Sequence, residues 1–240
     1  MTNFKTKLST VAICLATFVA ANATAADTAT LSVKGKFEPA ACTPTLVNEG
    51  VVDYGTMNTS LISVIAPANN SLIQLGKKAL TLTVKCDAAT MLGVVAQDNR
   101  ASSKVALSST SFIDDYIATE DLTGNYAAFG LGTVDGAKIG SYALTALQTG
   151  ATADGKAADL LIKDTSIANS SWQGVMLGAL FYSDASNVIT LAKSGESTPV
   201  AFSEMVLPLS ISTAVQTRSA MGNPSEVTLD GNATLSLVYL

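Results

Sequence analysis

The feature that most constrains this chain is alternation of apolar and polar residues at period two, which is typical of β-strands. In residues 28–37, TATLSVKGKF, every second residue is apolar or glycine, and residues 226–240, EVTLDGNATLSLVYL, repeat this pattern. Hardly any segment shows the spacing of a buried helix, and Gly, Asp and Asn separate the alternating runs. The sequence therefore predicts an all-β protein, either an antiparallel sandwich or a barrel.

Further strands are expected along the chain. Residues 79–87 and 91–96 are predicted to form a hairpin. Residues 201–215 are predicted to form two strands, one before and one after Pro208. Apolar or alternating segments also cover residues 126–134, 138–147, 175–182 and 188–192. Polar stretches between about 98 and 171 predict an insertion. No linker requires a second folded domain, so residues 39–240 are expected to form one.

The first 25 residues resemble a cleavable secretory signal peptide. Lys5 and Lys7 precede a largely apolar run over residues 8–21, and residues 22–25, NATA, supply a small-residue cleavage site after Ala25. The apolar run is shorter than the roughly 20 residues of a membrane-spanning helix. The chain is therefore expected to be exported, with residues 26–240 as the mature protein.

Two cysteines remain after that cleavage. Cys14 would leave with the signal peptide, and Cys42 and Cys86 would stay as an even pair in an exported protein. Because disulfides persist outside the reducing cytosol, a Cys42–Cys86 disulfide is the simplest prediction. Two buried free thiols are the alternative.

The charge balance and residue types exclude several functions. Removal of Lys5 and Lys7 leaves 12 basic residues against 19 acidic ones, a formal net charge of −7. Such a chain lacks the basic surface of a nucleic-acid binder. The sequence contains no histidine, which is the commonest general base and metal ligand. No cysteine or carboxylate spacing matches a metal site, and no phosphate-binding loop is present. We therefore expect no enzyme, no cofactor and no metal.

The two clean alternating strands lie at the two ends of the mature chain. Neither has a hairpin partner beyond it, so each would leave backbone donors and acceptors exposed, and addition of a strand from elsewhere would satisfy them. The apolar face of the first strand consists of Ala29, Leu31, Val33, Gly35 and Phe37. The apolar face of the last consists of Val227, Leu229, Gly231, Ala233, Leu235, Leu237 and Tyr239.

At these residues the sequence resembles pilin subunits of the chaperone–usher pathway. Residues 31–37, LSVKGKF, followed by Cys42, resemble a donor strand that leads into the first pilin cysteine. Residues 52–55, VDYG, resemble the next short strand, and residues 80–86, LTLTVKC, the strand that ends at the second cysteine. The terminal strand with a penultimate aromatic, Tyr239, completes the resemblance. The length of the chain is similar to that of a longer branch of fimbria-like exported proteins, one of which is encoded beside glutamate synthase genes.

This resemblance implies an incomplete immunoglobulin-like antiparallel β-sandwich that is completed by donor-strand addition. Residues 26–38 would be the donor extension, with a periplasmic chaperone, an outer-membrane usher and neighbouring copies of the chain or related subunits as partners. The expected function is that of a structural subunit of a surface fimbria, located first in the periplasm and then in the fimbrium. A soluble periplasmic binding or regulatory protein that closes its groove with its own first strand, and a fimbrial tip adhesin, are the alternatives.

Overall fold

The structure, a computed structural model, describes residues 30–36, 38, 40–63, 72–107 and 125–240. The chain divides into two compact units, Met1–Glu38 and Pro39–Leu240. The predicted signal peptide, and Ala29 and Phe37 of the predicted donor strand, lie outside the described residues.

In the first unit, the described residues form no regular secondary structure, and the side chains of Leu31 and Val33 are 87% and 88% exposed. The strand predicted over residues 28–37 is therefore not formed at residues 30–36. A strand without a partner gains no ladder of hydrogen bonds, and even an isolated two-stranded hairpin is only marginally stable in water.

The second unit is built from β-strands and short 3₁₀ turns, which confirms the all-β prediction. The strands are β1 (Cys42–Leu46), β2 (Ile73–Thr90), β3 (Leu92–Asp98), β4 (Phe129–Gly130), β5 (Thr133–Val134), β6 (Ala137–Lys138), β7 (Gly140–Leu147), β8 (Thr152–Ala153), β9 (Lys156–Asp164), β10 (Gln173–Gly174), β11 (Gly178–Leu180), β12 (Asn187–Lys193), β13 (Phe202–Val215) and β14 (Ala233–Tyr239). The 3₁₀ turns are η1 (Val47–Gly50), η2 (Thr59–Ile62), η3 (Ala101–Ser103) and η5 (Asn125–Ala127). Within the part of the chain that the structure describes, no helix is long and apolar enough to cross a bilayer.

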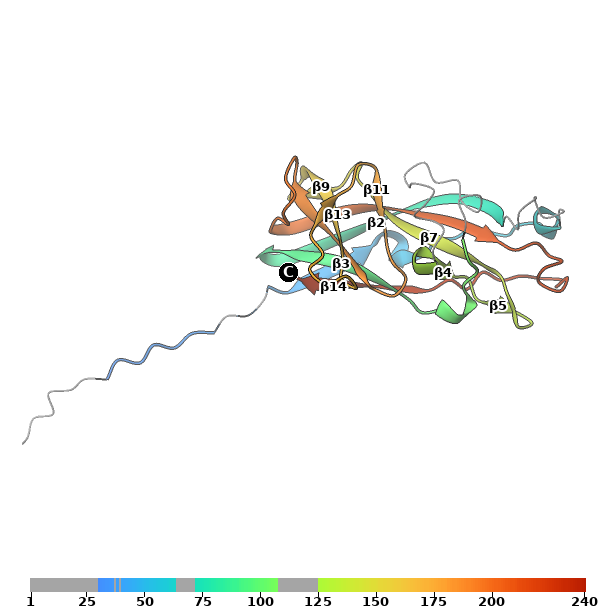
Figure 1. Ribbon diagram of the computed structural model, residues 1–240, viewed down its shortest axis with the longest axis horizontal. Helices are drawn as coiled ribbons and strands as arrows, with labels where there is room; N and C mark the ends of the chain where they lie inside the picture. Colours follow the sequence, from blue (N-terminus) through green and yellow to red (C-terminus); the bar gives the residue numbers. More distant parts are fainter. Residues whose placement is uncertain (1–29, 37, 39, 64–71, 108–124) are drawn as a thin grey trace, which may run out of the picture. The chain divides into compact units, whose positions relative to one another are not determined.

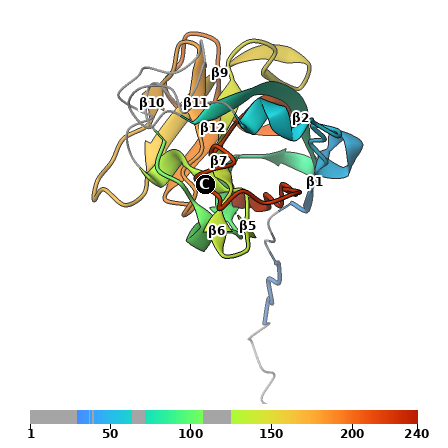
Figure 2. The same cartoon turned by 90° about the vertical axis from the view of Figure 1, so that its right-hand side faces the viewer.

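All the described strands except β5 and β6 form one antiparallel, nearly closed sheet, and β5 and β6 pair with each other in a separate two-stranded sheet (Figures 1 and 2). On one side, β2 pairs with β1 and β13, and β13 pairs with β7. On the other side, β14, β3, β12 and β9 pair in that order. The short strand β8 pairs with both β13 and β9 and so joins the two sides. The ends of this strand order are β1 and β14.

The core lies between the two sides of the sheet. The largest fully buried side chains come from β2, β3, β4, β9, β12 and β13 and from two loops: Phe129, Phe181, Phe202, Leu82, Leu92, Ile139, Leu160, Leu161, Ile189, Leu191, Met205 and Leu207. In β2 the apolar residues alternate as expected, because Leu82 and Val84 are buried and the intervening Thr83 is only partly covered. Period two therefore reports the buried face correctly.

The predicted hairpin of residues 79–87 and 91–96 is wrong. β2 and β3 follow each other directly, but both edges of β2 are occupied, one by β1 and the other by β13. β3 instead pairs with β12 and β14. The chain crosses from one side of the sheet to the other at Met91, so adjacency in sequence does not make these strands partners.

The prediction of two strands around Pro208 is also wrong, because β13 runs without interruption through it. Pro208 faces Thr81 of β2. On the opposite edge of β13, the partner changes from β8, which ends its pairing at Val206, to β7, which begins at Leu209. A residue without an N–H group is tolerated at such a gap in the ladder.

The predicted insertion at residues 98–171 supplies central strands where the structure describes it. β7 has β13 on one edge and β11 and β4 on the other, and β9 lies between β12 and the short strands β8 and β10. Residues 126–134 and 175–182 yield only the short strands β4, β5 and β11, and the last strand begins at Ala233 and not at Glu226. Residues 108–124 lie outside the description.

Candidate functional site

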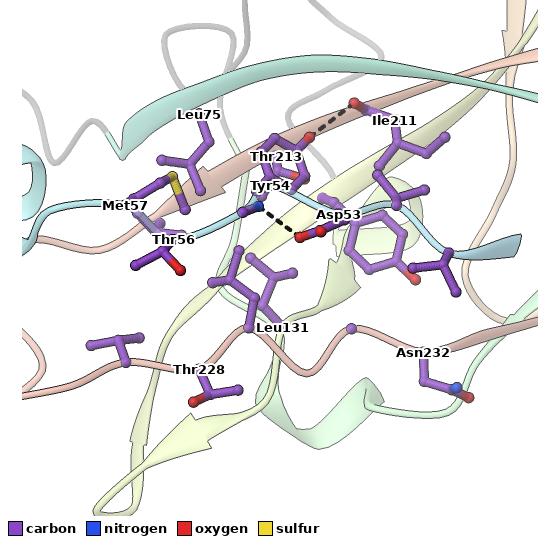
Figure 3. A pocket seen from close by; sticks show the side chains of 18 of the residues that line it. Asp53, Tyr54, Thr56, Met57, Leu75, Leu131, Ile211, Thr213, Thr228 and Asn232 are labelled. Carbon is purple, nitrogen blue, oxygen red and sulfur yellow. Dashed lines mark hydrogen bonds between the residues drawn. The ribbon is translucent and has the colours of Figure 1, made fainter. Parts of the chain in front are cut away.

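An open groove of about 990 Å³ lies in the second unit, between segments that come from near the two ends of the sheet (Figure 3). Its first wall is residues 49–59, which follow β1, and its second wall is residues 225–235, which lead into β14. Its floor is formed by side chains of β2, β7 and β13 and of the loop after β4. The groove therefore lies where the sheet fails to close.

The first wall places alternate side chains over the core. Val52, Tyr54 and Met57 are half-buried, whereas Asp53 and Gly55 are exposed. The Tyr54 hydroxyl donates to the Gly76 and Ile211 carbonyl oxygens, at 3.1 and 3.3 Å. Because these acceptors belong to β2 and β13, Tyr54 anchors the first wall to the floor.

The second wall has the same alternation. Val227, Leu229, Ala233 and Leu235 are half-buried and pack against the core. The Asp230 N–H donates to the Leu131 carbonyl oxygen at 2.9 Å. The wall is therefore anchored to the same floor from the other side.

An ion pair with the neighbouring turn also holds the second wall. The Arg100 guanidinium lies 2.8 Å from an Asp230 carboxylate oxygen, and Arg100 Nε donates to that carboxylate and to the Asp230 carbonyl oxygen. The Asn99 backbone N–H donates to the Asn232 carbonyl oxygen at 3.0 Å. These contacts fix the wall to the segment that follows β3.

The floor is apolar. Leu131, Leu144, Leu209, Ile211 and Val215 line it, and each is at least nine-tenths buried. Leu131 comes from the loop after β4, Leu144 from β7 and the other three from β13, and the pairing of β7 with β13 brings these distant segments together. An apolar floor of this kind favours a ligand that presents apolar side chains.

The two walls expose backbone groups without backbone partners. Within the part of the chain that the structure describes, residues 52–57 and 225–229 form no backbone–backbone hydrogen bond, and none joins one wall to the other. The Gly55 N–H is satisfied by the Asp53 side chain. β1 pairs only with β2 and β14 only with β3, so the free edges of both strands continue the same gap. The groove thus combines an apolar floor with two unpaired edges.

Burial perturbs two tyrosines at the groove. Burial raises the pKa of the Tyr142 phenol, and the negative charge of Asp98 adds a smaller effect in the same direction. Burial likewise raises the pKa of Tyr54, although its hydrogen bond with Thr213 opposes the shift. Lys78 Nζ lies 5.5 Å from the centre of the Tyr54 ring. Both phenols are neutral over the physiological range and act as apolar and hydrogen-bonding surface.

The disulfide prediction is confirmed. Cys42 and Cys86 are bonded, and they face each other across the first register position of the β1–β2 pair. Because β1 leads directly into the first wall, the disulfide ties the start of this wall to the long central strand β2.

The structure places only part of the predicted terminal face at the groove. Val227, Leu229, Gly231, Ala233 and Leu235 line it. A Cβ atom added to Gly231 would lie 2.9 Å from Tyr142 Cε1, so a larger residue at this position would force the Tyr142 ring to shift.

The last two residues of that face lie elsewhere. Leu237 packs against the core, and the Tyr239 hydroxyl donates to the Ala40 carbonyl oxygen at 3.0 Å, beyond the end of the groove. Of the predicted donor face, Leu31, Val33 and Gly35 belong to the separate first unit.

Sequence reasoning missed the floor and most of the first wall. Val52–Gly55 was predicted as a short strand and instead lacks regular secondary structure, because its edge has no backbone partner among the described residues. The alternation of Val52 and Tyr54 was the available signal for this wall. No local signal identified Leu131 or Tyr142 as groove residues. Among the described residues, no three Cys, Asp or Glu side chains form a group that could hold a metal ion.

The fold and groove define an all-β protein whose antiparallel sheet remains open along one apolar groove. Residues 31–143 match the family described as "Protein of unknown function (DUF1120)". The chain is 37% identical to "Protein GltF" of Escherichia coli (strain K12) over an alignment that covers 99% of both chains. It is 31% identical to "Uncharacterized protein YhcF" of the same strain, over 93% of this chain and 95% of that one. The chain belongs to this DUF1120 family, and it is related along nearly its whole length to GltF and YhcF.

Proposed function

We propose that this protein is a structural subunit of a surface fimbria that polymerises by donor-strand exchange. The observation that carries the proposal is the apolar groove whose two walls have unpaired backbone edges. A β-strand inserted there would pair with both walls and cover the floor with every second side chain.

The N-terminal extension has the properties of such a strand. Leu31 and Val33 are almost fully exposed in the first unit, although removal of large apolar side chains from water lowers the free energy of the system. Burial of each in a groove would contribute about 1.5–3 kcal/mol, in addition to the new backbone hydrogen bonds. Gly35 on the same face has no neighbour within 4 Å. In a groove, its missing side chain would allow close approach of the backbones.

Before assembly, the proposed function requires export of the chain to the periplasm and binding by a chaperone. The signal peptide would direct the chain to the periplasm, where the Cys42–Cys86 disulfide can form. A periplasmic chaperone would fill the groove before an outer-membrane usher assembles the subunits. An open apolar groove would otherwise be an aggregation hazard, which is the physical reason for a temporary occupant.

The main test compares the mature protein with and without residues 26–37. We expect the complete protein to form multimers, and the truncated protein to remain monomeric while its groove still binds a synthetic peptide of residues 28–37. Binding is measured as a rise in the melting temperature of the truncated protein. Multimers that form equally well without residues 26–37 would contradict donor-strand exchange.

A point substitution tests the face that enters the groove. Gly35→Val should abolish multimers without changing the melting temperature of the monomer, because the added side chain points into the groove. Ser32→Val is the matched control, since Ser32 belongs to the opposite face and the same side chain would point outward. Multimers of normal length from the Gly35 variant would contradict the proposal.

The same experiments distinguish donor-strand exchange between copies from a monomer that fills its groove with its own extension. A periplasmic protein that closes its groove with its own extension would stay monomeric in all variants. In that case, removal of residues 26–37 would lower the melting temperature of a monomer and abolish no multimer.

A further inference from the structure

The charged residues that line the groove are all acidic, and a nearby described lysine, Lys78, is placed over the Tyr54 ring. Glu49 and Asp53 on the first wall and Glu226 on the second wall are exposed and line the groove. No lysine or arginine in the described part of the chain lines it. These three carboxylates take part in no ion pair with described residues, unlike Asp230, which is bound by Arg100.

The N-terminal extension carries the opposite charge on the face that would point outward. In an extended strand, Lys34 and Lys36 lie on the side opposite Leu31 and Val33. Lys36 forms an ion pair with Glu38. Lys34 forms no ion pair with any described residue, so its charge is available to a partner.

We propose that the acidic rim recognises the basic outer face of the extension of a second copy of this chain. This inference rests on the proposed function and names the occupant of the groove as residues 30–36 of an identical subunit. The apolar floor would accept any alternating strand, whereas the rim favours a strand with lysines on its outer face. Charge complementarity of this kind raises the rate of association and disfavours wrong partners.

The dimensions bring Lys34 close to Asp53. An extended strand over residues 30–36 spans about 23 Å at about 3.3 Å per residue, and an extended stretch as long as residues 225–235 spans about 36 Å. The extension therefore fits within the groove. Lys34 lies one residue from the middle of that strand, and Asp53 one residue from the middle of the first wall. A centred strand places these two residues near each other in either direction of insertion.

The test is a double-mutant cycle on the complete mature protein, with assembly followed by light scattering. Lys34→Glu should slow assembly about 10-fold in about 20 mM salt. The effect should fall below about 2-fold in about 1 M salt, where the screening length is about 3 Å. In a background with Glu49→Gln, Asp53→Asn and Glu226→Gln, the same Lys34 substitution should change the rate less than about 2-fold at either salt concentration, because its charged partners are gone.

The double-mutant cycle has one matched control and one fallback variant. Lys156→Glu makes the same charge change on an exposed lysine at the start of β9, outside the groove, and should leave the salt-dependent rate within about 2-fold of the original. If the triple variant does not fold, Asp53→Asn alone carries the test, because the amide oxygen still accepts the hydrogen bond from the Gly55 N–H.

The outcomes distinguish this inference from the proposed function. If the original protein forms no multimers, donor-strand exchange fails and this inference fails with it. If it forms multimers but Lys34→Glu acts equally in both backgrounds, or no more than Lys156→Glu, the charge recognition is wrong and the proposed function stands. A charge effect on the melting temperature of a persistent monomer would place the chain's own extension in the groove and overturn the assignment to a second copy.

Discussion

Replacement of both disulfide cysteines by alanine should destabilise the protein by about 4 kcal/mol. Cys42 and Cys86 are separated by 44 residues, and the bond closes this loop in the unfolded chain. The chain-entropy estimate for a loop of about 45 residues is about 4 kcal/mol at 25 °C. The effect falls on an edge strand, since β1 has only β2 as a partner. The first wall of the groove follows directly and should lose its fixed starting point.

Urea denaturation of the original protein and of the Cys42→Ala, Cys86→Ala variant measures this loss. With a slope of about 2 kcal/mol/M, the midpoint should fall by about 2 M. The melting temperature should fall by roughly 8–16 °C, at about 2–4 °C per kcal/mol for a chain of this size. Reduction of the original protein should move its midpoint in the same direction.

A matched control lies in the same strand. The Thr45 hydroxyl donates to the Thr83 carbonyl oxygen at 3.4 Å, so Thr45→Ala removes one weak, exposed link between β1 and β2 and should cost less than about 1 kcal/mol. A loss below about 1 kcal/mol in the double cysteine variant would refute the loop-entropy reasoning. It would mean that the reduced, unfolded chain already holds residues 42–86 close together.

Three further substitutions test the packing around the groove. Burial raises the pKa of Tyr142 above its unfolded value of about 10, so the folded protein holds this proton more tightly than the unfolded chain, and stability falls as the pH rises above about 10. The Tyr142→Phe variant should therefore lose less stability than the original protein between pH 9 and 11 in urea titrations. An equal loss in both proteins would contradict this. Gly140→Ala places a Cβ atom 2.2 Å from a backbone oxygen of β13 and should cost at least about 1–3 kcal/mol, whereas Gly174→Ala, with open space around it, should stay within about 0.5 kcal/mol in the same assay. Arg100→Leu removes the contacts to Asp230 and should speed hydrogen exchange at the Asp230 amide, while unchanged exchange would show that the ion pair does not hold the second wall.

Local pattern determined which faces are buried. Leu82 and Val84 in β2, and Val227, Leu229 and Leu235 at the second wall, point toward the core as their spacing predicts. The disulfide was also predictable, because the two cysteines that remain after the predicted signal peptide allow a single pairing. These properties depend on residue types and on the period of a strand, and both are written in the sequence.

Strand partners were decided only in the folded molecule. The pattern that made residues 79–87 and 91–96 strands did not reveal that β13, more than 100 residues away, would occupy the edge of β2. Nor did it reveal that Pro208 falls where one neighbour of β13 replaces another. Edges are filled by competition among all strands, so a local period cannot specify the winner.

The groove shows the same division. Alternation at each end of the chain indicated that two strand edges would lack partners, and this is a property of the sequence. Only the second of these segments lies at the groove, and its meeting with a different segment, residues 49–59, over Leu131, Tyr142 and Ile211 is a property of the tertiary structure. It arises because β2, β13 and β7 bring segments that are distant in sequence to one floor, and only three-dimensional packing brings them together.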